Sequence, residues 1–291
     1  MKPAPFDYVR PASIDDAVAA LVAANGDGKI LAGGQSLLPL LNFRMARPAV
    51  IVDINRIAGL ASIERRGDTV VIGALARHRE IEISPVIAAH LPVMSYAMRY
   101  VAHLAVRNRG TIGGSLSHAD PAAEHPMLAL FYDARIVVQG PSGRRHIPAD
   151  AFFVDALTTC LAADEIVCAI EYPILPGHCG WAFEEVSRRH GDFALACIAV
   201  SLAVNDNSVT DARVAAMGIA DTPLRLRAAE DVLRGARVDA ATTQAFADAV
   251  RSTVSPNSDL HASSDYRRRL VGSLAERALA AALARAQADP S

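Results

Sequence analysis

The stretch "ILAGGQSLLPLLNFRMARP" at residues 30–48 places two adjacent glycines directly after a short apolar run. Residues 29–32 are typical of a buried strand, and residues 36–45 have the apolar spacing of a short helix. Glycine has no Cβ, so the backbone N–H groups of a glycine pair can approach one bound group closely. A strand, a glycine pair and the start of a helix therefore predict a loop that holds an anion, for which phosphate is the natural ligand.

A second glycine pair follows about eighty residues later, in "RNRGTIGGSLSHADPAAEHP" at residues 107–126. The Gln35 and Ser36 side chains can donate hydrogen bonds at the first loop, and the Thr111 and Ser115 hydroxyls can do so at the second. Two such loops in one domain suit a diphosphate held from both sides, which indicates a dinucleotide. Glycine pairs are also common in ordinary turns, so either pair alone would more often have a structural role, and it is the occurrence of both that favours a ligand.

Other nucleotide-binding motifs are absent from the sequence. No GxGxxG follows a first strand, because "GDGKIL" follows a predicted helix and lacks the third glycine. No GxxxxGK[ST] motif is present, which argues against a P-loop nucleotidase. The predicted dinucleotide is therefore not held in the Rossmann manner.

Composition limits the classes of partner and the cellular location. The 291 residues have a formal net charge of −2, so no basic field points to nucleic acid or an acidic membrane. The N-terminus has no secretory signal and no apolar run is long enough to span a bilayer, so we expect a cytoplasmic protein. The cysteines form no CxxC pair, which predicts reduced thiols and no zinc or iron–sulfur site on this chain: Cys160, Cys168, Cys179 and Cys197.

Hydrophobic periodicity and turn signals predict an α+β chain. Residues 1–55 have the pattern of a small β-α-β unit. Later strands are predicted at 68–74, 134–148 and 164–176, and helices at 85–103 and 121–132. After a linker at 173–180 we expect a three-stranded antiparallel sheet over residues 181–189, 193–204 and 208–219. Amphipathic helices are then expected over residues 223–235, 240–254 and 264–286.

The chain closely resembles the FAD-binding medium subunit of the molybdenum hydroxylases, the group of carbon monoxide dehydrogenase, xanthine dehydrogenase and the bacterial N-heterocycle dehydrogenases. The resemblance lies in both glycine-loop stretches, in "FEEVSRRHGDFALA" and in "SDYRRRLVGSLAERAL", so it covers nearly the whole sequence. It implies a two-subdomain, PCMH-like FAD-binding domain over residues 1–177, with subdomains of about 1–55 and 56–177. A C-terminal domain of a three-stranded sheet plus helices would follow at 178–291.

The resemblance also implies a set of FAD contacts and no catalytic acid, base or nucleophile on this chain. FAD would lie between the two subdomains, its diphosphate wrapped by both loops: Leu31, Ala32, Gly33, Gly34, Gln35, Ser36 and Leu37, with Thr111, Gly113, Gly114 and Ser115. Val101 and Ala102 match a stretch near the flavin, Glu124 an acidic position that bonds the FAD chain, and Ile166 and Val167 a strand contact. Phe193 matches an aromatic residue, often tyrosine, beside the isoalloxazine. Some relatives carry lysine at the position of Glu185, so a cationic contact is not expected there.

Partners are implied in the same way. A small subunit would carry two [2Fe–2S] clusters and a large subunit the molybdopterin cofactor, in a dimer of heterotrimers that passes electrons through FAD to an external acceptor. Two alternatives stay open at this point. One is a stand-alone flavin-dependent oxidoreductase, and the other is a nucleotide-binding regulatory or assembly protein.

Four other clusters attract attention. Ser117, His118 and Asp120 lie too close together for a hydrolase triad, and no GxSxG accompanies them, so we expect a helix-capping role for Asp120. His118 and His125 are expected in loops or in solvent rather than on a metal. Arg107–Arg109 suits either a phosphate or surface ion pairs. Ser187–His190 is predicted to be a solvated strand end or a subunit contact.

Overall fold

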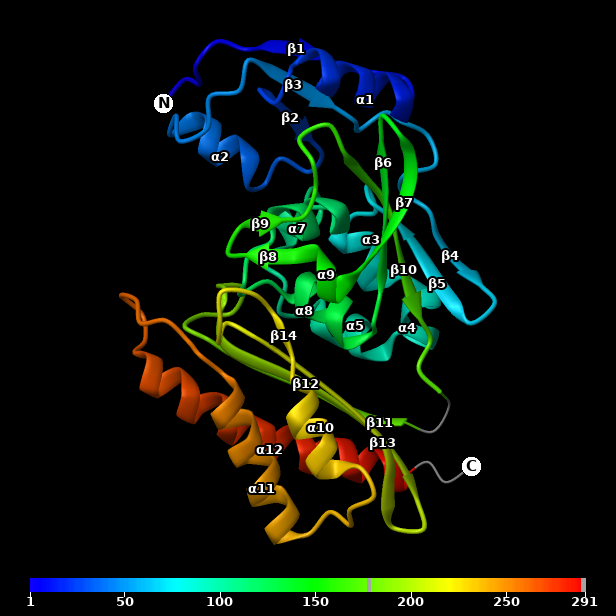
Figure 1. Cartoon of the computed structure of the whole chain (residues 1–291), viewed down its shortest axis with the longest axis vertical. Coiled ribbons are helices and arrows are strands. Elements are labelled where there is room, and N and C mark those ends of the chain that lie inside the picture. The colour runs from blue at the N-terminus through cyan, green and yellow to red at the C-terminus, as the bar shows by residue number, and fades with distance from the viewer. Residues whose placement is uncertain (177–178, 289–291) are drawn as a thin grey trace.

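The computed structural model describes residues 1–176 and 179–288, and its sheets are arranged in three bodies along the long axis of the molecule (Figure 1). The first is a parallel sheet in the order β1-β3-β2, from β1 (Asp7–Val9), β2 (Gly28–Leu31) and β3 (Val50–Asp53). It carries α1 (Ile14–Ala23), whose N-cap Ser13 accepts a bond from the Asp16 amide, and α2 (Leu37–Asn42). Strand β1 was not predicted, because three residues show no periodicity.

The middle body is an antiparallel sheet in the order β4-β5-β10-β6-β7 with a layer of short helices. Its strands are β4 (Ile63–Arg66), β5 (Thr69–Gly73), β6 (Arg135–Gly140), β7 (Gly143–Pro148) and β10 (Ile166–Pro173). The helices are α3 (His78–Ile83), α4 (Pro85–His90), α5 (Pro92–Ala97), α6 (Leu104–Arg107), α7 (Ile112–His118), α8 (Glu124–Phe131) and α9 (Ala149–Phe152), and β8 (Phe153–Asp155) and β9 (Thr158–Thr159) form a hairpin. The single helix predicted over 85–103 is wrong, because Pro92 starts a new helix and residues 98–103 form a turn.

The C-terminal sheet has four strands, not the predicted three, in the order β11-β12-β13-β14. These are β11 (Cys179–Ser187), β12 (Ala194–Asn205), β13 (Ser208–Met217) and β14 (Leu224–Arg225). The extra strand forms because residues predicted as the start of a helix instead pair with β13, Leu224 opposite Ala216 and Arg225 opposite Ala215. Helix α10 (Arg227–Leu233) therefore begins later than expected, and α11 (Ala240–Thr253) and α12 (Ser264–Ala288) follow it.

The two faces of this sheet have different neighbours. Phe183 and Cys197 belong to the core of the middle body, whereas Ala182 and Ile198 pack in a second core with α11 and α12. The sheet thus lies between the helices at the end of the molecule and the middle body (Figure 1). The predicted domain boundary at 177/178 lies outside the described residues. Within the described ranges, no helix is both long enough and apolar enough to cross a membrane.

Candidate functional site

The first glycine loop presents a run of unused backbone donors. In the part of the chain that the structure describes, the N–H groups of residues 32–37 donate no hydrogen bond to another protein atom. Gly34 has a φ of 73°, in the left-handed region that favours glycine. The Gln35 amide donates to the Gly33 carbonyl at 3.3 Å rather than outward, and Ser36 makes no side-chain cap bond. Successive free amides of this kind form a concave site for an anion.

The second loop differs from this expectation, because its amides are occupied by the fold. The Ile112 and Gly113 amides donate to Ala76 and Ala74 carbonyls at 3.1 and 2.9 Å. The Gly114 amide donates to Thr111 Oγ1 at 3.2 Å, and the Ser115 amide to the Thr111 carbonyl at 3.0 Å. Residues 111–115 are therefore the N-cap and first turn of α7 rather than an open cradle like the first loop.

The glycines bring the two loops into contact. A methyl group on Gly33 would overlap the Arg109 carbonyl oxygen and lie 2.8 Å from the Gly110 Cα. One on Gly113 would lie 2.5 Å from the Ala74 Cβ. One on Gly114 would meet only Thr111 Oγ1, at 2.8 Å. The structure thus places the two predicted loops side by side, with Gly33 at their contact.

A buried histidine pair supports the second loop. His125 Nε2 lies 2.9 Å from His78 Nδ1 in a stacked arrangement, and the His78 amide donates to the Gly110 carbonyl. Burial, with the nearby Arg107 and Arg77 charges, lowers the pKa of His78 to about 4, and burial lowers the pKa of His125 well below 6.5. Both rings are neutral near pH 7. The expectation that His125 lies in a loop or in solvent is wrong, because α8 begins at Glu124 and directs His125 into the core.

Arg107 forms an ion pair and hydrogen bonds within the protein, so for this residue the structure favours the ion-pair role over the phosphate-binding role that was also expected for residues 107–109. Its Nε atom pairs with Glu82 at 3.0 Å, and its Nη1 atom donates to the Val101 and Ala102 carbonyls at 3.0 and 2.8 Å. These bonds hold the turn in which Ala102 has a φ of 44°. Arg107 therefore fixes two residues predicted to lie near a flavin.

The C-terminal domain contacts this same turn. A methyl group on Gly191 would lie 2.8 Å from the His103 ring. Phe193, two residues on, is 62% exposed, which is unusual for an aromatic side chain at a domain junction. A cavity of about 730 Å³ opens beside it, with Asp120, Arg188, Leu195, His261 and Arg267 also in its wall. Phe193, Val101 and Ala102 are thus gathered in one region from distant parts of the chain.

Two buried carboxyl groups lie close by. Glu185, Cys197 and Met217 form one row across the C-terminal sheet, and the Gly218 amide donates to the Pro121 carbonyl just before Glu124. Burial raises the pKa of Glu124 to about 7 and that of Glu185 to about 9, and each is raised further by a neighbouring carboxylate. Glu185 Oε2 is buried without a partner among the described residues. Glu185 is therefore neutral at pH 7.

The remaining predicted positions take different places. Ile166 and Val167 on β10 have side chains buried in two apolar cores, so only their backbone is available to a ligand. Asp120 Oδ1 accepts a hydrogen bond from the Ala122 amide at 2.9 Å. This bond forms a turn before α8, so Asp120 is not the N-cap of that helix, which is Ala123. Among the described residues no group of three His, Cys, Asp or Glu side chains is placed to hold a metal ion. Ser187 donates to the Arg189 carbonyl at 2.8 Å, and Arg188 contacts His261 across the cavity.

Some residues that organise the site were missed from the sequence. His78, Arg77 and Asn55 lie beside the loops, yet none belongs to a motif, and each follows a strand in a stretch without periodicity. An asparagine two residues after the aspartate that ends β3 is the one local signal that suggests a loop anchor.

The chain matches known proteins over nearly its full length. Residues 4–175 match the FAD binding domain in molybdopterin dehydrogenase, and residues 181–282 match the CO dehydrogenase flavoprotein C-terminal domain. It is 41% identical over 288 residues to the 6-hydroxypseudooxynicotine dehydrogenase complex subunit alpha of Paenarthrobacter nicotinovorans, covering 99% of this chain and 97% of that protein. It is 40% identical to the carbon monoxide dehydrogenase medium chain of Hydrogenophaga pseudoflava, covering 98% and 99%.

Solved structures agree with this assignment. Carbon monoxide dehydrogenase from Hydrogenophaga pseudoflava superposes with a TM-score of 0.95 at 41% identity, covering 98% of this chain and 99% of that one. Quinoline 2-oxidoreductase from Pseudomonas putida 86 superposes with a TM-score of 0.93 at 35% identity, covering 98% and 100%. Both halves of the sequence and the whole fold lead to the same conclusion: the chain belongs to the FAD-binding medium subunits of the molybdenum hydroxylases.

Proposed function

We propose that this chain holds FAD with its diphosphate on the free amides of residues 32–37 and its isoalloxazine toward Val101, Ala102 and Phe193. The observation that carries the proposal is the run of unpaired N–H groups in the first loop, which the fold leaves unsatisfied. Gly33 is buried and Ala32 and Gly34 are half-buried, so unpaired amides at these residues are costly and are most simply explained by an anionic ligand. The second loop contacts the first at Gly33, and its Ser115 hydroxyl is a further donor to the diphosphate.

The protein's own share of the chemistry is binding and orientation. A bound flavin supplies two-electron chemistry and can pass electrons singly. Arg107 fixes the turn at Ala102, and the Gly191 turn brings the exposed Phe193 ring to the same region. Glu124 lies there with its carboxyl pKa raised to about 7, so near neutral pH it can either accept or donate a hydrogen bond. The backbone of Ile166 and Val167 completes the proposed contacts.

The proposal places the chain between an electron source and an external acceptor. Relatives named as medium chains and as subunits of dehydrogenase complexes support a small partner with [2Fe–2S] clusters and a large partner with the molybdopterin cofactor. We extend this to a dimer of heterotrimers. The four free cysteine thiols support assembly in the reducing cytoplasm.

The test is the flavin content and reducibility of the chain and of its native complex. The purified complex is expected to show flavin absorbance that substrate bleaches and an added acceptor restores. The full chain alone is expected to bind FAD stoichiometrically. A full chain that folds but takes up no FAD, together with a native complex without flavin, would overturn the proposal.

A further inference from the structure

The Arg77 side chain connects the two glycine loops. Its Nη1 atom donates to the Arg109 carbonyl, at the entrance to the second loop, and its Nη2 atom donates to Asn55 Oδ1 at 2.6 Å. The Asn55 amide in turn donates to the carbonyls of Leu31 and Ala32, at 3.2 and 2.8 Å. The Arg77 guanidinium and the Asn55 amide thus link residues 31–32 to residue 109 through hydrogen bonds.

Asn55 orients the first loop. In a planar trans peptide the C=O of one residue and the N–H of the next point in opposite directions. Because the Leu31 and Ala32 carbonyls point to Asn55, the Ala32 and Gly33 amides point away from it. Asn55 is itself fixed, because Asp53 Oδ1 accepts from its backbone N–H at 2.9 Å and from Nδ2 at 2.7 Å. The first free donors of the loop are therefore aimed by a side chain, not by glycine freedom alone.

Arg77 also brings charge to the loops. In the described residues its guanidinium makes no ion pair with a carboxylate, and neither does that of Arg109. The nearest carboxylates that act on Arg77 are Glu80, which accepts from its backbone N–H, and Asp53, which is bonded to Tyr8 and Asn55. The Arg77 charge close to a loop of free amides, with the Arg109 charge acting on Arg77, favours an anionic ligand.

We propose that Arg77 and Asn55 are cofactor-positioning residues, which set the spacing of the two loops, aim the first amides toward the diphosphate and place a positive charge behind the loop that carries those amides. This inference rests on the proposed function. It extends the site to two side chains outside both glycine motifs and assigns them to the diphosphate, not to the flavin ring.

The experiment measures FAD binding by the full chain after removal of bound flavin, using quenching of flavin fluorescence, and measures ADP binding by competition. Arg77→Gln and Asn55→Ala are expected to weaken both FAD and ADP at least tenfold. Arg77→Lys keeps the charge but cannot make both bonds, so its affinity is expected to lie between wild type and Arg77→Gln. Arg79→Gln is the control, because Arg79 is two residues away and pairs with Glu82 at 2.9 Å.

A thermal unfolding curve of each flavin-free variant shows whether it is folded. If Arg77→Gln does not fold, Arg77→Lys decides, and wild-type affinity for both ligands in that variant would overturn the inference. Equal weakening by Arg77→Gln and Arg79→Gln would also overturn it. A wild-type chain that binds neither FAD nor ADP would instead contradict the proposed function itself.

Discussion

Gly33 lies so close to Gly110 that a methyl group on Gly33 would come within 2.8 Å of the Gly110 Cα. This contact joins the loop after β2 to the loop before α7, backbone against backbone, with no space for a side chain. The glycine of the first loop therefore serves the assembly of the site as well as the approach of a ligand. Its neighbour Gly34 serves a different need, because its φ of 73° is disfavoured for other residues.

Gly33→Ala is expected to separate the loops and to weaken FAD binding at least tenfold. Gly114→Ala is the matched comparison, because its methyl group would meet only a hydroxyl oxygen that can rotate, so a smaller loss is expected. Gly33→Asp and Gly114→Asp should both abolish flavin retention, since each adds a negative charge near the diphosphate. Flavin content after gel filtration measures all four, and equal retention by Gly33→Ala and wild type would contradict the contact argument.

Glu185→Gln is expected to stabilise the chain increasingly as pH rises. The folded-state pKa of Glu185 is raised from 4.5 to about 9, by burial first and then by Glu124. The contribution of the Glu185 carboxyl to the free energy of unfolding is fully present below pH 4.5 and is lost as pH rises through 9. The reason is that Glu185 ionises in the unfolded chain while it still holds its proton in the folded chain. Glutamine does not ionise, so the gain in Tm over wild type should be larger at pH 9 than at pH 5 by several degrees.

The control for this measurement is Glu184→Gln. Glu184 lies on the opposite face of β11 and pairs with Arg277 on α12 at 2.6 Å. Groups that face Glu185 from other elements are Glu124, Cys197 and Tyr100, and none of them is altered in either variant. If the gain in Tm for Glu185→Gln is independent of pH, or if Glu184→Gln shows the same dependence on pH, the Glu185 carboxyl is not held neutral.

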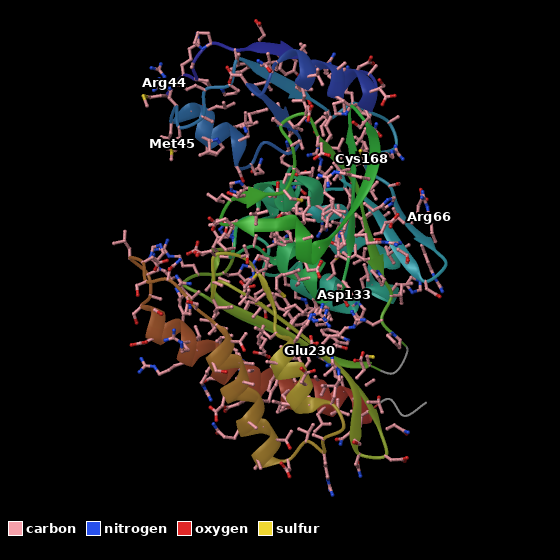
Figure 2. The ribbon with its side chains drawn as sticks, in the orientation of Figure 1. Arg44, Met45, Arg66, Asp133, Cys168 and Glu230 are labelled. Carbon is pink, nitrogen blue, oxygen red and sulfur yellow. The ribbon has the colours of Figure 1, made fainter. Side chains whose placement is uncertain are left out.

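Arg225→Ala is expected to lower the free energy of unfolding by about 3–5 kcal/mol, because it removes the more buried of the two cations that pair with the Glu230 carboxylate. Glu230 is fully buried, and Arg225 contacts both it and Asp133, the latter at 2.8 Å. Asp133 and Glu230 lie on the two sides of the junction between the middle body and the C-terminal domain (Figure 2). Arg66→Ala removes an exposed pair with Glu64 and should change the free energy by only about 0–1 kcal/mol. Urea unfolding curves of both variants test the difference.

Phe193→Ser is expected to leave the stability of the flavin-free chain within about 0.5 kcal/mol of wild type, because an exposed side chain makes few contacts. The flavin environment should change, visible as a shift in the absorbance spectrum and in the midpoint potential of the bound flavin. Phe193→Tyr keeps the ring and should resemble wild type. Identical flavin spectra and potentials in Phe193→Ser and wild type would remove Phe193 from the site.

Much of this fold is readable from local sequence. Ser13 marks the start of α1, alternation and turn residues mark the hairpin at 134–148, and the first glycine pair lies between β2 and α2. Strand β14 was missed because two residues carry no period, and the pairing that makes them a strand is long-range. Helix α5 was merged with its neighbour although Pro92 signals a new start.

The candidate site was predicted less completely than the fold. The motifs give the loops, but not which loop keeps its amides free, because that depends on the Ala74 and Ala76 carbonyls from another segment. The same holds for His125, whose buried ring meets that of His78 from 47 residues away. Asn55 and Arg77 act through side-chain hydrogen bonds to residues distant in sequence, and no local pattern records such bonds.

The most direct measurement is an experimental density map of the native complex with FAD bound. We predict that the diphosphate oxygens lie within hydrogen-bond distance of the amides of residues 33–36, with Arg77 on the Asn55 side of that loop and the isoalloxazine near Phe193. A diphosphate that contacts neither residues 32–37 nor Arg77, with those amides bonded only to protein or water, would contradict it.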